Sequence, residues 1–378
     1  MQLLFLIDNL CGGGAEKVLI DIIKNLNSNK YDVELFLIRN KGVYLQDVPK
    51  NIKVNYIYND KLYEKKKMYK IYYLLTKIHF KINRMLGLGR LFKKNIKKKY
   101  DVYIPFLEGA CIQLISDSDL SEKKIAWIHT DLMKHNIMKL DKERKALEAM
   151  DKLVCVSEAS KISLITKHPE FNNRVTVINN PIDLVSIDKK ANEEICYEKI
   201  FNNNNPTFIA IGRVEKVKGH DLLIEAHKKL INEGINHNIA ILGTGGELNN
   251  LEKIIKNESL EKSFKFLGFE SNPYKYLKKA DFYIMPSRYE GYPLSLCEAI
   301  ALEKPIIATN FESANDILKN GKLGLIAEIE DIEDIACKMK EVLQDKNLAT
   351  ELQKNCRVFK NKLGFEEKII EIEDIIDN

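Results

Sequence analysis

The hydrophobic positions of the chain fall into short apolar runs that alternate with longer amphipathic segments. The runs of strand length are LLFLID, DVELFLIR, YDVYIPF, KKIAWIH, KLVCVS and VTVINN in the first half, and TFIAIG, NIAILG, FKFLGF, DFYIMP, PIIAT and GLIAE in the second. Segments such as HDLLIEAHKKLINEG and ELNNLEKIIKN carry apolar residues at helical spacing. Strands that alternate with helices from end to end predict an α/β protein with parallel sheets.

The polar stretches predict where the domains divide. A length of 378 residues fits two or three domains. Residues 184–205 are polar and end in a run of asparagine, which is poor in helices and strands, so we expect a linker there between domains at 1–183 and 206–360. Isoleucines at helical spacing predict an amphipathic helix in 361–378. Two such domains suggest a cleft, with ligands beyond the carboxyl ends of the strands.

Composition excludes several classes of protein. With 45% hydrophobic and 30% charged residues, global disorder is excluded. No apolar stretch reaches the length of a membrane-spanning helix. The N-terminal MQLLFLIDNL lacks a basic start and is expected to form a first strand, not a signal peptide. Seven cysteines without CxxC spacing are expected to be reduced thiols of a cytoplasmic protein, and no structural zinc site is expected.

One segment holds most of the positive charge. Residues 61–99 contain 14 lysines and arginines and a single acid, a net charge of +13, while the whole chain has +5. The cations alternate with aromatic and aliphatic residues. Such a segment suits an anionic membrane surface, although a solvated pair of helices is an alternative. Nucleic acid is not expected as a partner, because no known recognition module is present.

Glycine-rich loops follow several of the predicted strands. Gly13 and Gly14 lie between the first strand and the first helix, where backbone amides favour an anion. A nicotinamide dinucleotide is disfavoured, because Lys17 stands where that fingerprint needs a third glycine. Gly243 and Gly245 follow another strand. Each cluster could also be only a tight turn.

Two cations stand in the loop that follows TFIAIG. Arg213 and Lys218 could hold a diphosphate, since arginine offers a planar fork and lysine a point charge. A solvated basic loop is the alternative for any such pair.

The segment PSRYEGYPLSLCEAIA follows the strand DFYIMP and combines several features. Pro293 is placed to begin a helix, so the amides of Leu294 and Ser295 could bind phosphate oxygens. Glu290 lies in the loop and Glu298 lies eight residues later in the helix, and both carboxylates could accept hydrogen bonds from sugar hydroxyls. Glu298 could instead be a surface residue, although its apolar neighbours disfavour that.

Two further positions are candidates in the first half. His129 ends the run KKIAWIH and could act at a reacting centre, or could be a half-buried histidine with satisfied hydrogen bonds. Asp117 and Asp119 have the spacing that can hold a divalent metal on a nucleotide diphosphate. They lie in a polar loop where acids are common, and two cations are available for the diphosphate, so no metal is expected.

Taken in order, these loops resemble the retaining glycosyltransferases of family 4, which have the GT-B architecture of two Rossmann-like domains facing a central cleft. The resemblance covers nearly the whole chain. It rests on GGGAE (12–16), WIH (127–129), VSE (156–158), NNPID (179–183), GRVEKVKG (212–219), GTGGE (243–247), FLGF (266–269) and SRYEGYPLSLCEAIA (287–301).

The resemblance implies roles for the matched residues. The implied catalytic residues are His129, Arg213, Lys218 and Glu290. The implied donor-binding residues are Gly13, Gly14, Arg213, Lys218, Gly243, Gly245, Phe269, Glu290, Gly291, Tyr292, Leu294, Ser295 and Glu298. Among these, Arg213 and Lys218 would hold the diphosphate, Glu298 the ribose and Glu290 the donor sugar. The backbone around Phe269 would contact the nucleobase.

The implied activity is the transfer of a sugar from a nucleotide-diphosphate sugar, with UDP as the expected nucleotide, to a glycan or a polyprenyl-diphosphate-linked acceptor in bacterial surface polysaccharide or glycolipid synthesis. We expect retention of anomeric configuration by front-side attack, no cofactor and no metal. We also expect a cytoplasmic enzyme bound peripherally to the inner face of the cell membrane through 61–99. The alternatives are a sugar-nucleotide 2-epimerase of the same architecture and a catalytically inactive, membrane-associated partner subunit.

The chain departs from the family pattern at two places. ATNFESANDIL (308–318) replaces a glycine-bearing loop, and the proline that is common between Arg213 and Lys218 is absent. Neither change removes a charged group that the mechanism needs.

Overall fold

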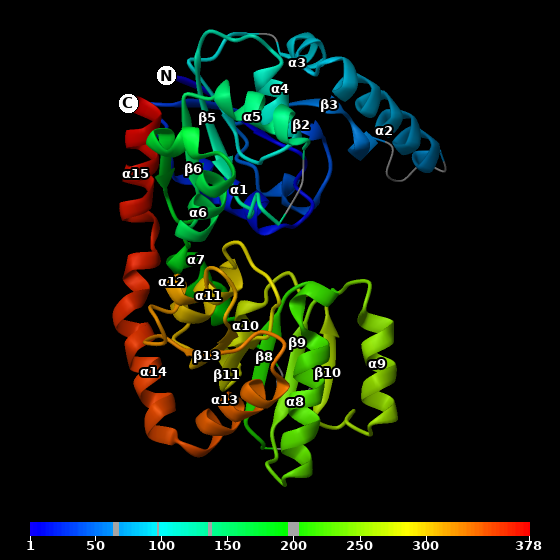
Figure 1. Ribbon diagram of the computed structural model, residues 1–378, viewed down its shortest axis with the longest axis vertical. Coiled ribbons are helices and arrows are strands. Elements are labelled where there is room, and N and C mark those ends of the chain that lie inside the picture. Colours follow the sequence, from blue (N-terminus) through cyan, green and yellow to red (C-terminus); the bar gives the residue numbers. More distant parts are fainter. Residues whose placement is uncertain (63–67, 97, 135–137, 196–203) are drawn as a thin grey trace. The chain divides into compact units, whose positions relative to one another are not determined.

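The computed structural model describes residues 1–62, 68–96, 98–134, 138–195 and 204–378 (Figure 1). The chain divides into two compact units. Unit 1 comprises Met1–Pro181 and Phe365–Asn378, and unit 2 comprises Ile182–Gly364.

Unit 1 is built on a seven-stranded sheet, counted over its described residues, in the order β3-β2-β1-β4-β5-β6-β7. Its strands are β1 (Gln2–Ile7), β2 (Asp32–Arg39), β3 (Lys53–Tyr58), β4 (Val102–Pro105), β5 (Lys123–Ile128), β6 (Lys152–Cys155) and β7 (Val175–Val177). All of these strands pair in parallel. The central strands are apolar and buried, because helices cover the sheet as parallel connections require.

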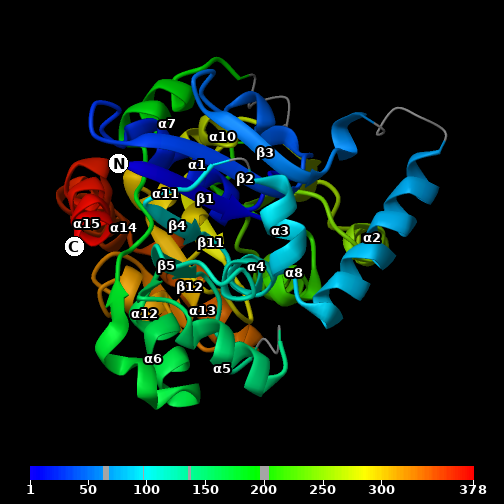
Figure 2. The ribbon, with the colours of Figure 1, turned by 90° about the horizontal axis from the view of Figure 1, so that it is seen from above.

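The helices of unit 1 are α1 (Gly14–Asn25), α2 (Tyr69–Leu86), α3 (Gly89–Asn95), α4 (Ala110–Ser116), α5 (Leu140–Glu148), α6 (Glu158–Lys167) and α15 (Phe365–Asp377), with 3-10 turns η1 (Val43–Gln46), η2 (Asp60–Leu62) and η3 (Pro169–Arg174). Helix α1 buries the apolar face that its spacing predicts. Helix α2 has no buried residue and lies at the periphery of unit 1 in both ribbon views, in contact with the ends of β2 and β3 through Arg39 and Tyr58 (Figures 1 and 2).

Unit 2 contains a six-stranded sheet in its described residues, in the order β10-β9-β8-β11-β12-β13. The strands are β8 (Thr207–Ile211), β9 (Asn238–Leu242), β10 (Phe264–Gly268), β11 (Phe282–Met285), β12 (Ile306–Thr309) and β13 (Leu325–Ala327). They coincide with the six apolar runs of the second half and pair in parallel. The chain order reverses between β8 and β11, and ligands of such sheets bind at that switch.

The helices of unit 2 are α7 (Leu184–Ala191), α8 (His220–Asn232), α9 (Leu248–Asn257), α10 (Tyr274–Lys279), α11 (Leu294–Ala301), α12 (Ala314–Ile317), α13 (Ile332–Gln344) and α14 (Lys346–Phe359), with turns η5 (Lys216–Lys218) and η6 (Lys360–Leu363). The two predicted parallel-sheet α/β domains are thus confirmed. No helix in the described part of the chain has the length and apolarity needed to cross a bilayer.

The boundaries of the units differ from the expected ones. The expected linker 184–205 begins with helix α7, which Asp183 caps by accepting a hydrogen bond from the amide of Ser186 at 2.8 Å. Ile187 and Ala191 are buried in the core of unit 2, so this segment belongs to that unit. The expected linker residues 196–203 lie outside the described residues.

The expected C-terminal helix is present as α15, but it belongs to unit 1 instead of forming a separate segment. Lys123 of β5 donates to the carbonyl oxygens of Ile375 and Ile376 at 3.0 and 2.9 Å. The side chain of Ile372 is buried together with those of the same two isoleucines. Burial of this apolar face explains why the last residues of the chain return to the first unit.

Candidate functional site

Three loops at the carboxyl ends of neighbouring strands form the candidate site of unit 2. They follow β8 (212–219), β9 (243–247) and β11 (286–293), and the first and third flank the switch in strand order. The sequence predicts these loops, and the structure brings them together in one unit.

Lys218 and Glu290 form an ion pair between two of these loops. The Nζ atom of Lys218 lies 2.6 Å from Oε1 of Glu290, and both side chains are largely buried. The hydroxyl of Ser287 donates to the same oxygen at 2.7 Å. The two residues expected at the diphosphate and at the donor sugar are therefore in contact in this structure.

Arg213 lies in the loop after β8, as Lys218 does, but its side chain is exposed and makes no ion pair within the described residues. The aliphatic part of Lys218 runs over the backbone of Gly212, since a Cβ built there would lie 3.6 Å from Lys218 Cε. One cation is thus held by a carboxylate while its neighbour faces solvent.

The glycines of the second loop are explained by close packing. A Cβ on Gly243, where φ is +153°, would lie 1.8 Å from the carbonyl oxygen of Gly212, and one on Gly245 would lie 2.2 Å from that of Val214. The amide of Val214 also donates to the carbonyl oxygen of Thr244 at 2.9 Å. Gly243 and Gly245 therefore support the loop that carries Arg213, and their contact with a donor stays a prediction.

Helix α11 begins as its sequence predicts. Pro293 is its N-cap, so the amides of Leu294 and Ser295 lie in the first turn, where an α-helix leaves amides without internal partners. The hydroxyl of Tyr283 donates to Oγ of Ser295 at 2.9 Å. Gly291 and Tyr292 lie in the half-buried loop before the helix.

Glu298 lies inside unit 2, not on its surface. Its side chain is buried, and the hydroxyl of Tyr274 donates to Oε1 at 2.8 Å. A buried carboxylate is stable only with hydrogen-bond donors around it, which makes Glu298 a suitable acceptor for ribose hydroxyls. Phe269, which follows β10, is 70% exposed and available to a flat ring.

His129 stands at the carboxyl end of β5 in unit 1. Its ring packs against Phe106 with centroids 5.0 Å apart, and Nε2 has no hydrogen-bond partner among the described residues. Burial lowers the pKa of His129 to about 4, against an opposing effect of the nearby Glu108 carboxylate. The ring is therefore neutral at pH 7. The amide of His129 donates to Oε2 of Glu108 at 3.0 Å.

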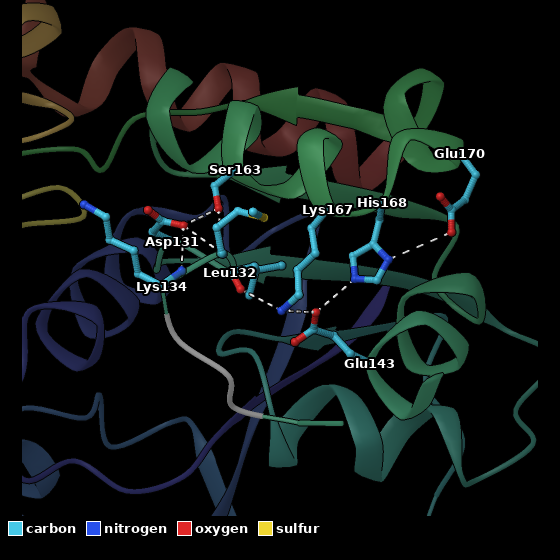
Figure 3. A network of polar contacts seen from close by, with 9 residues as sticks. Asp131, Leu132, Lys134, Glu143, Ser163, Lys167, His168 and Glu170 are labelled. Atoms are coloured by element: carbon cyan, nitrogen blue, oxygen red, sulfur yellow. Dashed lines mark hydrogen bonds and ion pairs between the residues drawn. The ribbon is translucent and has the colours of Figure 1, made fainter. Parts of the chain in front are cut away.

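A polar network holds the loop that follows His129 (Figure 3). The carboxylate of Asp131 accepts hydrogen bonds from the hydroxyl of Ser163 and from the amide of Met133. Lys167 donates to the carbonyl of Leu132 at 2.6 Å and pairs with Glu143 at 2.8 Å, and His168 contacts the same Glu143 at 2.9 Å. The end of β5 is thus tied to helices α5 and α6.

The remaining candidates have local roles in unit 1. Gly13 is the N-cap of α1 and Gly14 its first residue, both exposed. Oδ2 of Asp117 accepts from the amide of Leu88 at 2.7 Å, so this carboxylate joins α4 to α3. In the described residues no cluster of three or more metal-ligating side chains is present. The roles of Gly13, Gly14 and His129 toward a donor stay predictions.

Sequence reasoning missed Arg288, which lies two residues before Glu290. Its guanidinium forms a bidentate pair with Asp221 at 2.7 and 2.8 Å and also binds Glu330. Its partners are 67 and 42 residues away in the chain. No short-range pattern signals such pairs.

Two family models match the chain and together span most of it. One, described as Glycosyltransferase Family 4, matches residues 12–186, and the other, described as Glycosyl transferases group 1, matches residues 192–359.

Curated relatives resemble the chain over different shares of its length. A Campylobacter jejuni protein named N-acetylgalactosamine-N,N'-diacetylbacillosaminyl-diphospho-undecaprenol 4-alpha-N-acetylgalactosaminyltransferase is 27% identical over 362 residues, which are 94% of this chain and 91% of that protein. An Escherichia coli protein named UDP-Gal:alpha-D-GlcNAc-diphosphoundecaprenol alpha-1,3-galactosyltransferase is 28% identical over 217 residues, which are 56% of each chain.

Solved structures share the fold. HepE of Anabaena in complex with UDP has a TM-score of 0.78 at 18% identity, with full coverage of both chains. WaaG, a glycosyltransferase involved in lipopolysaccharide biosynthesis, has a TM-score of 0.69 at 14% identity and covers 99% of both. At these identities the likeness shows the architecture of the two units.

Proposed function

We propose that this chain, which belongs to the glycosyltransferases of family 4, transfers a sugar from a UDP-sugar to a polyprenyl-diphosphate-linked or glycan acceptor, with retention of anomeric configuration. The observation that supports the donor assignment is the cluster of Arg213, Lys218, Glu290 and the first turn of α11 beside the strand switch of unit 2. Two cations and a helix N-terminus suit a diphosphate, and Glu298 suits the ribose.

In the proposed chemistry these groups act on the leaving diphosphate. Negative charge builds on it as the bond to the anomeric carbon breaks, and Arg213, Lys218 and the α11 amides stabilise that charge. The bond from the acceptor oxygen forms on the same face of the sugar, and the hydroxyl proton passes to the departing phosphate oxygen. The step needs no metal and no covalent nucleophile.

The relatives' names support the choice of donor and acceptor. The two relatives described above are named for diphospho-undecaprenol acceptors, one of them with UDP-galactose, and HepE was solved with UDP. These names favour a transferase over the alternative of a 2-epimerase.

The donor assignment is tested by isothermal titration calorimetry with UDP, GDP and ADP. We expect UDP to bind tightest and Arg213→Ala to weaken UDP about tenfold or more, the value of one charge-assisted hydrogen bond. Arg357→Ala is the matched control, because Arg357 lies on α14 and pairs with Glu303. Equal UDP affinity in Arg213→Ala and wild type would contradict the assignment. Conversion of a UDP-sugar to its 2-epimer in the absence of any acceptor would support the epimerase.

Helix α2 supports a second proposal, that the enzyme binds the inner face of the cell membrane through 61–99. Within the segment 61–99, residues 63–67 and 97 lie outside the described residues. The large apolar residues exposed on α2 are Ile71, Leu74, Leu75, Ile78, Ile82, Met85 and Leu86, with exposed fractions from 48% to 82%. At 100° per residue they fall in one stripe about 120° wide.

The opposite face of α2 holds the helix to unit 1. Arg39 donates to the hydroxyl of Thr76 at 2.8 Å, and the ring of Tyr58 packs edge-on against that of Phe80, with centroids 6.4 Å apart. The apolar stripe therefore points away from these contacts. Lys70, Lys77 and Lys81 follow one edge of the stripe on the helical wheel. An anionic bilayer satisfies both features, with the stripe among acyl chains and the lysines among phosphates.

Vesicle sedimentation tests this surface. We expect the protein to bind vesicles of phosphatidylglycerol and phosphatidylcholine at low salt and Leu75→Glu/Ile78→Glu to lose most of that binding. Ile162→Glu is the control, since Ile162 is an exposed isoleucine of α6 in the same unit. Equal binding of the α2 variant and the control would refute the proposal.

A further inference from the structure

We propose that Arg288 is a positioning residue for diphosphate recognition, which sets Lys218 in place by fixing the turn that carries it. The inference rests on the proposed donor site. The side chain of Arg288 forms its hydrogen bonds and ion pairs with Lys216, Asp221 and Glu330, not with Lys218 or Glu290. Instead it joins the loop after β11, which carries Glu290, to η5, which carries Lys218.

The guanidinium of Arg288 is fully used. Nη1 donates to the carbonyl oxygen of Lys216 at 2.6 Å and to Asp221 Oδ1 at 2.7 Å. Nη2 donates to Asp221 Oδ2 at 2.8 Å and to Glu330 Oε2 at 3.1 Å, and Nε donates to Glu330 Oε1. An arginine has five N–H donors, and each has an acceptor here.

The backbone of Arg288 adds to this contact. Its amide donates to the carbonyl oxygen of Val217 at 2.8 Å. Two residues after Val217, Gly219 has φ +67°, and a Cβ there would lie 1.9 Å from the carbonyl oxygen of Pro286. The two loops thus meet backbone to backbone, on either side of Lys218 in sequence.

The two acidic partners of Arg288 come from two further segments of unit 2. Asp221 lies in the first turn of α8. Burial raises the pKa of its carboxyl, but the hydrogen bonds and the charge of Arg288 outweigh this, and the pKa lies below its ordinary value. Glu330 follows β13 and has φ +63°, a left-handed conformation that is uncommon for glutamate. Arg288 therefore links three loops at the carboxyl edge of the sheet of unit 2.

This geometry has a consequence for the nucleotide. Lys218 reaches its place from a three-residue turn. Replacement of Arg288 keeps the backbone bond to Val217 but removes the side-chain bond to Lys216, which should loosen the turn and the side chain of Lys218 together. The effect of Arg288 on a nucleotide should pass through Lys218. The loss of affinity caused by replacing Arg288 should therefore grow with the number of phosphates on the nucleotide. It should vanish in a protein whose Lys218 has already been replaced by alanine.

Calorimetry on the full chain tests this with UMP and UDP as probes. We expect Arg288→Ala to raise the Kd of UDP about tenfold and that of UMP less than about twofold. In a protein that already carries Lys218→Ala, the same change should raise the Kd of UDP by less than about twofold further, because the effects of residues that act as a unit are not additive. Arg288→Lys keeps the charge but not the fork and should recover only part of the loss. Arg357→Ala, the control, should leave the Kd of both UMP and UDP unchanged.

Each result decides the inference. Equal weakening of UMP and UDP, or full additivity with Lys218→Ala, would mean that Arg288 supports the fold in general and would overturn the role. If Arg288→Ala does not fold, Asp221→Asn removes the bidentate pair with little change in shape and is judged by the same UMP and UDP ratio. A wild-type protein that binds no nucleoside diphosphate would overturn the donor site itself. Tight UDP binding that is unaffected in Arg288→Ala would overturn only the positioning role of Arg288.

Discussion

Replacement of Glu298 by glutamine tests the ribose assignment with little change in shape. Glu298 is 5% exposed and lies within α11, and its Oε1 accepts a hydrogen bond from Tyr274 at 2.8 Å. A glutamine side chain has nearly the same volume and its carbonyl oxygen can keep the bond to Tyr274. The folded state should therefore persist, and any effect on ligands should reflect the lost charge.

The expected magnitude follows from that charge. Hydrogen bonds to a charged group contribute about 1.5–3 kcal/mol, whereas neutral ones contribute about 1 kcal/mol. If the carboxylate accepts from two ribose hydroxyls, its conversion to an amide should cost roughly 1–4 kcal/mol, a rise of about 5- to 900-fold in the Kd of UDP. The rise should be accompanied by a loss of selectivity for the ribose.

The assay compares UDP with 2′-deoxy-UDP by calorimetry. Wild type should prefer UDP by about tenfold, the value of one charge-assisted bond, and Glu298→Gln should reduce that preference to about threefold or less. Glu333→Gln is the control, because Glu333 is an exposed partner of Lys229 on α13. A wild-type protein that binds both nucleotides equally, or a Glu298→Gln protein that keeps the full preference, would refute the ribose role.

Two predictions concern the stability of unit 2. Burial, and next the charge of the nearby His237, lower the pKa of His227 to about 3. An unfolded histidine binds a proton below about pH 6.5 while the folded ring stays neutral, so the free energy of unfolding should fall below that pH, by ~2 kcal/mol at pH 5. Denaturant unfolding at pH 7 and 5 should show the gap between wild type and His227→Gln narrowing by that amount, and a constant gap would contradict it. Gly243→Ala, with its Cβ against Gly212, should lower the unfolding temperature by at least ~4 °C, measured by calorimetric melting, and an unchanged value would show that the loop adapts.

The sequence predicts the strands of unit 2 well because each is a short apolar run bounded by turns, and all six of those runs form strands. The strand it misses is β3, KVNYIY, at the edge of the sheet in unit 1. An edge strand has fewer neighbours to bury its side chains, so polar residues interrupt its pattern. Likewise α7 forms the start of the polar stretch 184–205, and the capping residue Asp183 just before it is the local signal of a helix.

In the candidate site, too, some features are predictable from the sequence and others are not. Loops that follow strands are predictable, because parallel strands bring their carboxyl ends to one edge. Contacts between these loops are not, as Lys218 and Glu290 are 72 residues apart and Arg288 and Asp221 are 67 apart. Their pairing depends on which strands become neighbours in the sheet. Only the order of β8 and β11 decides that, and no local pattern encodes it.

The ion pair between Lys218 and Glu290 explains how one site can hold a carboxylate beside a diphosphate. Like charges about 4 Å apart repel by ~4 kcal/mol near a protein surface, but Lys218 at 2.6 Å and Ser287 at 2.7 Å stabilise the Glu290 carboxylate before a ligand arrives. Removal of the carboxylate should therefore free Lys218 for phosphate. Glu290→Gln should bind UDP as tightly as wild type or tighter while transfer slows at least tenfold, whereas Lys218→Ala should weaken UDP and transfer together. Calorimetry and an acceptor-dependent transfer assay separate these outcomes. Weaker UDP binding by Glu290→Gln would mean that the carboxylate helps to hold the diphosphate loops and does not compete for Lys218.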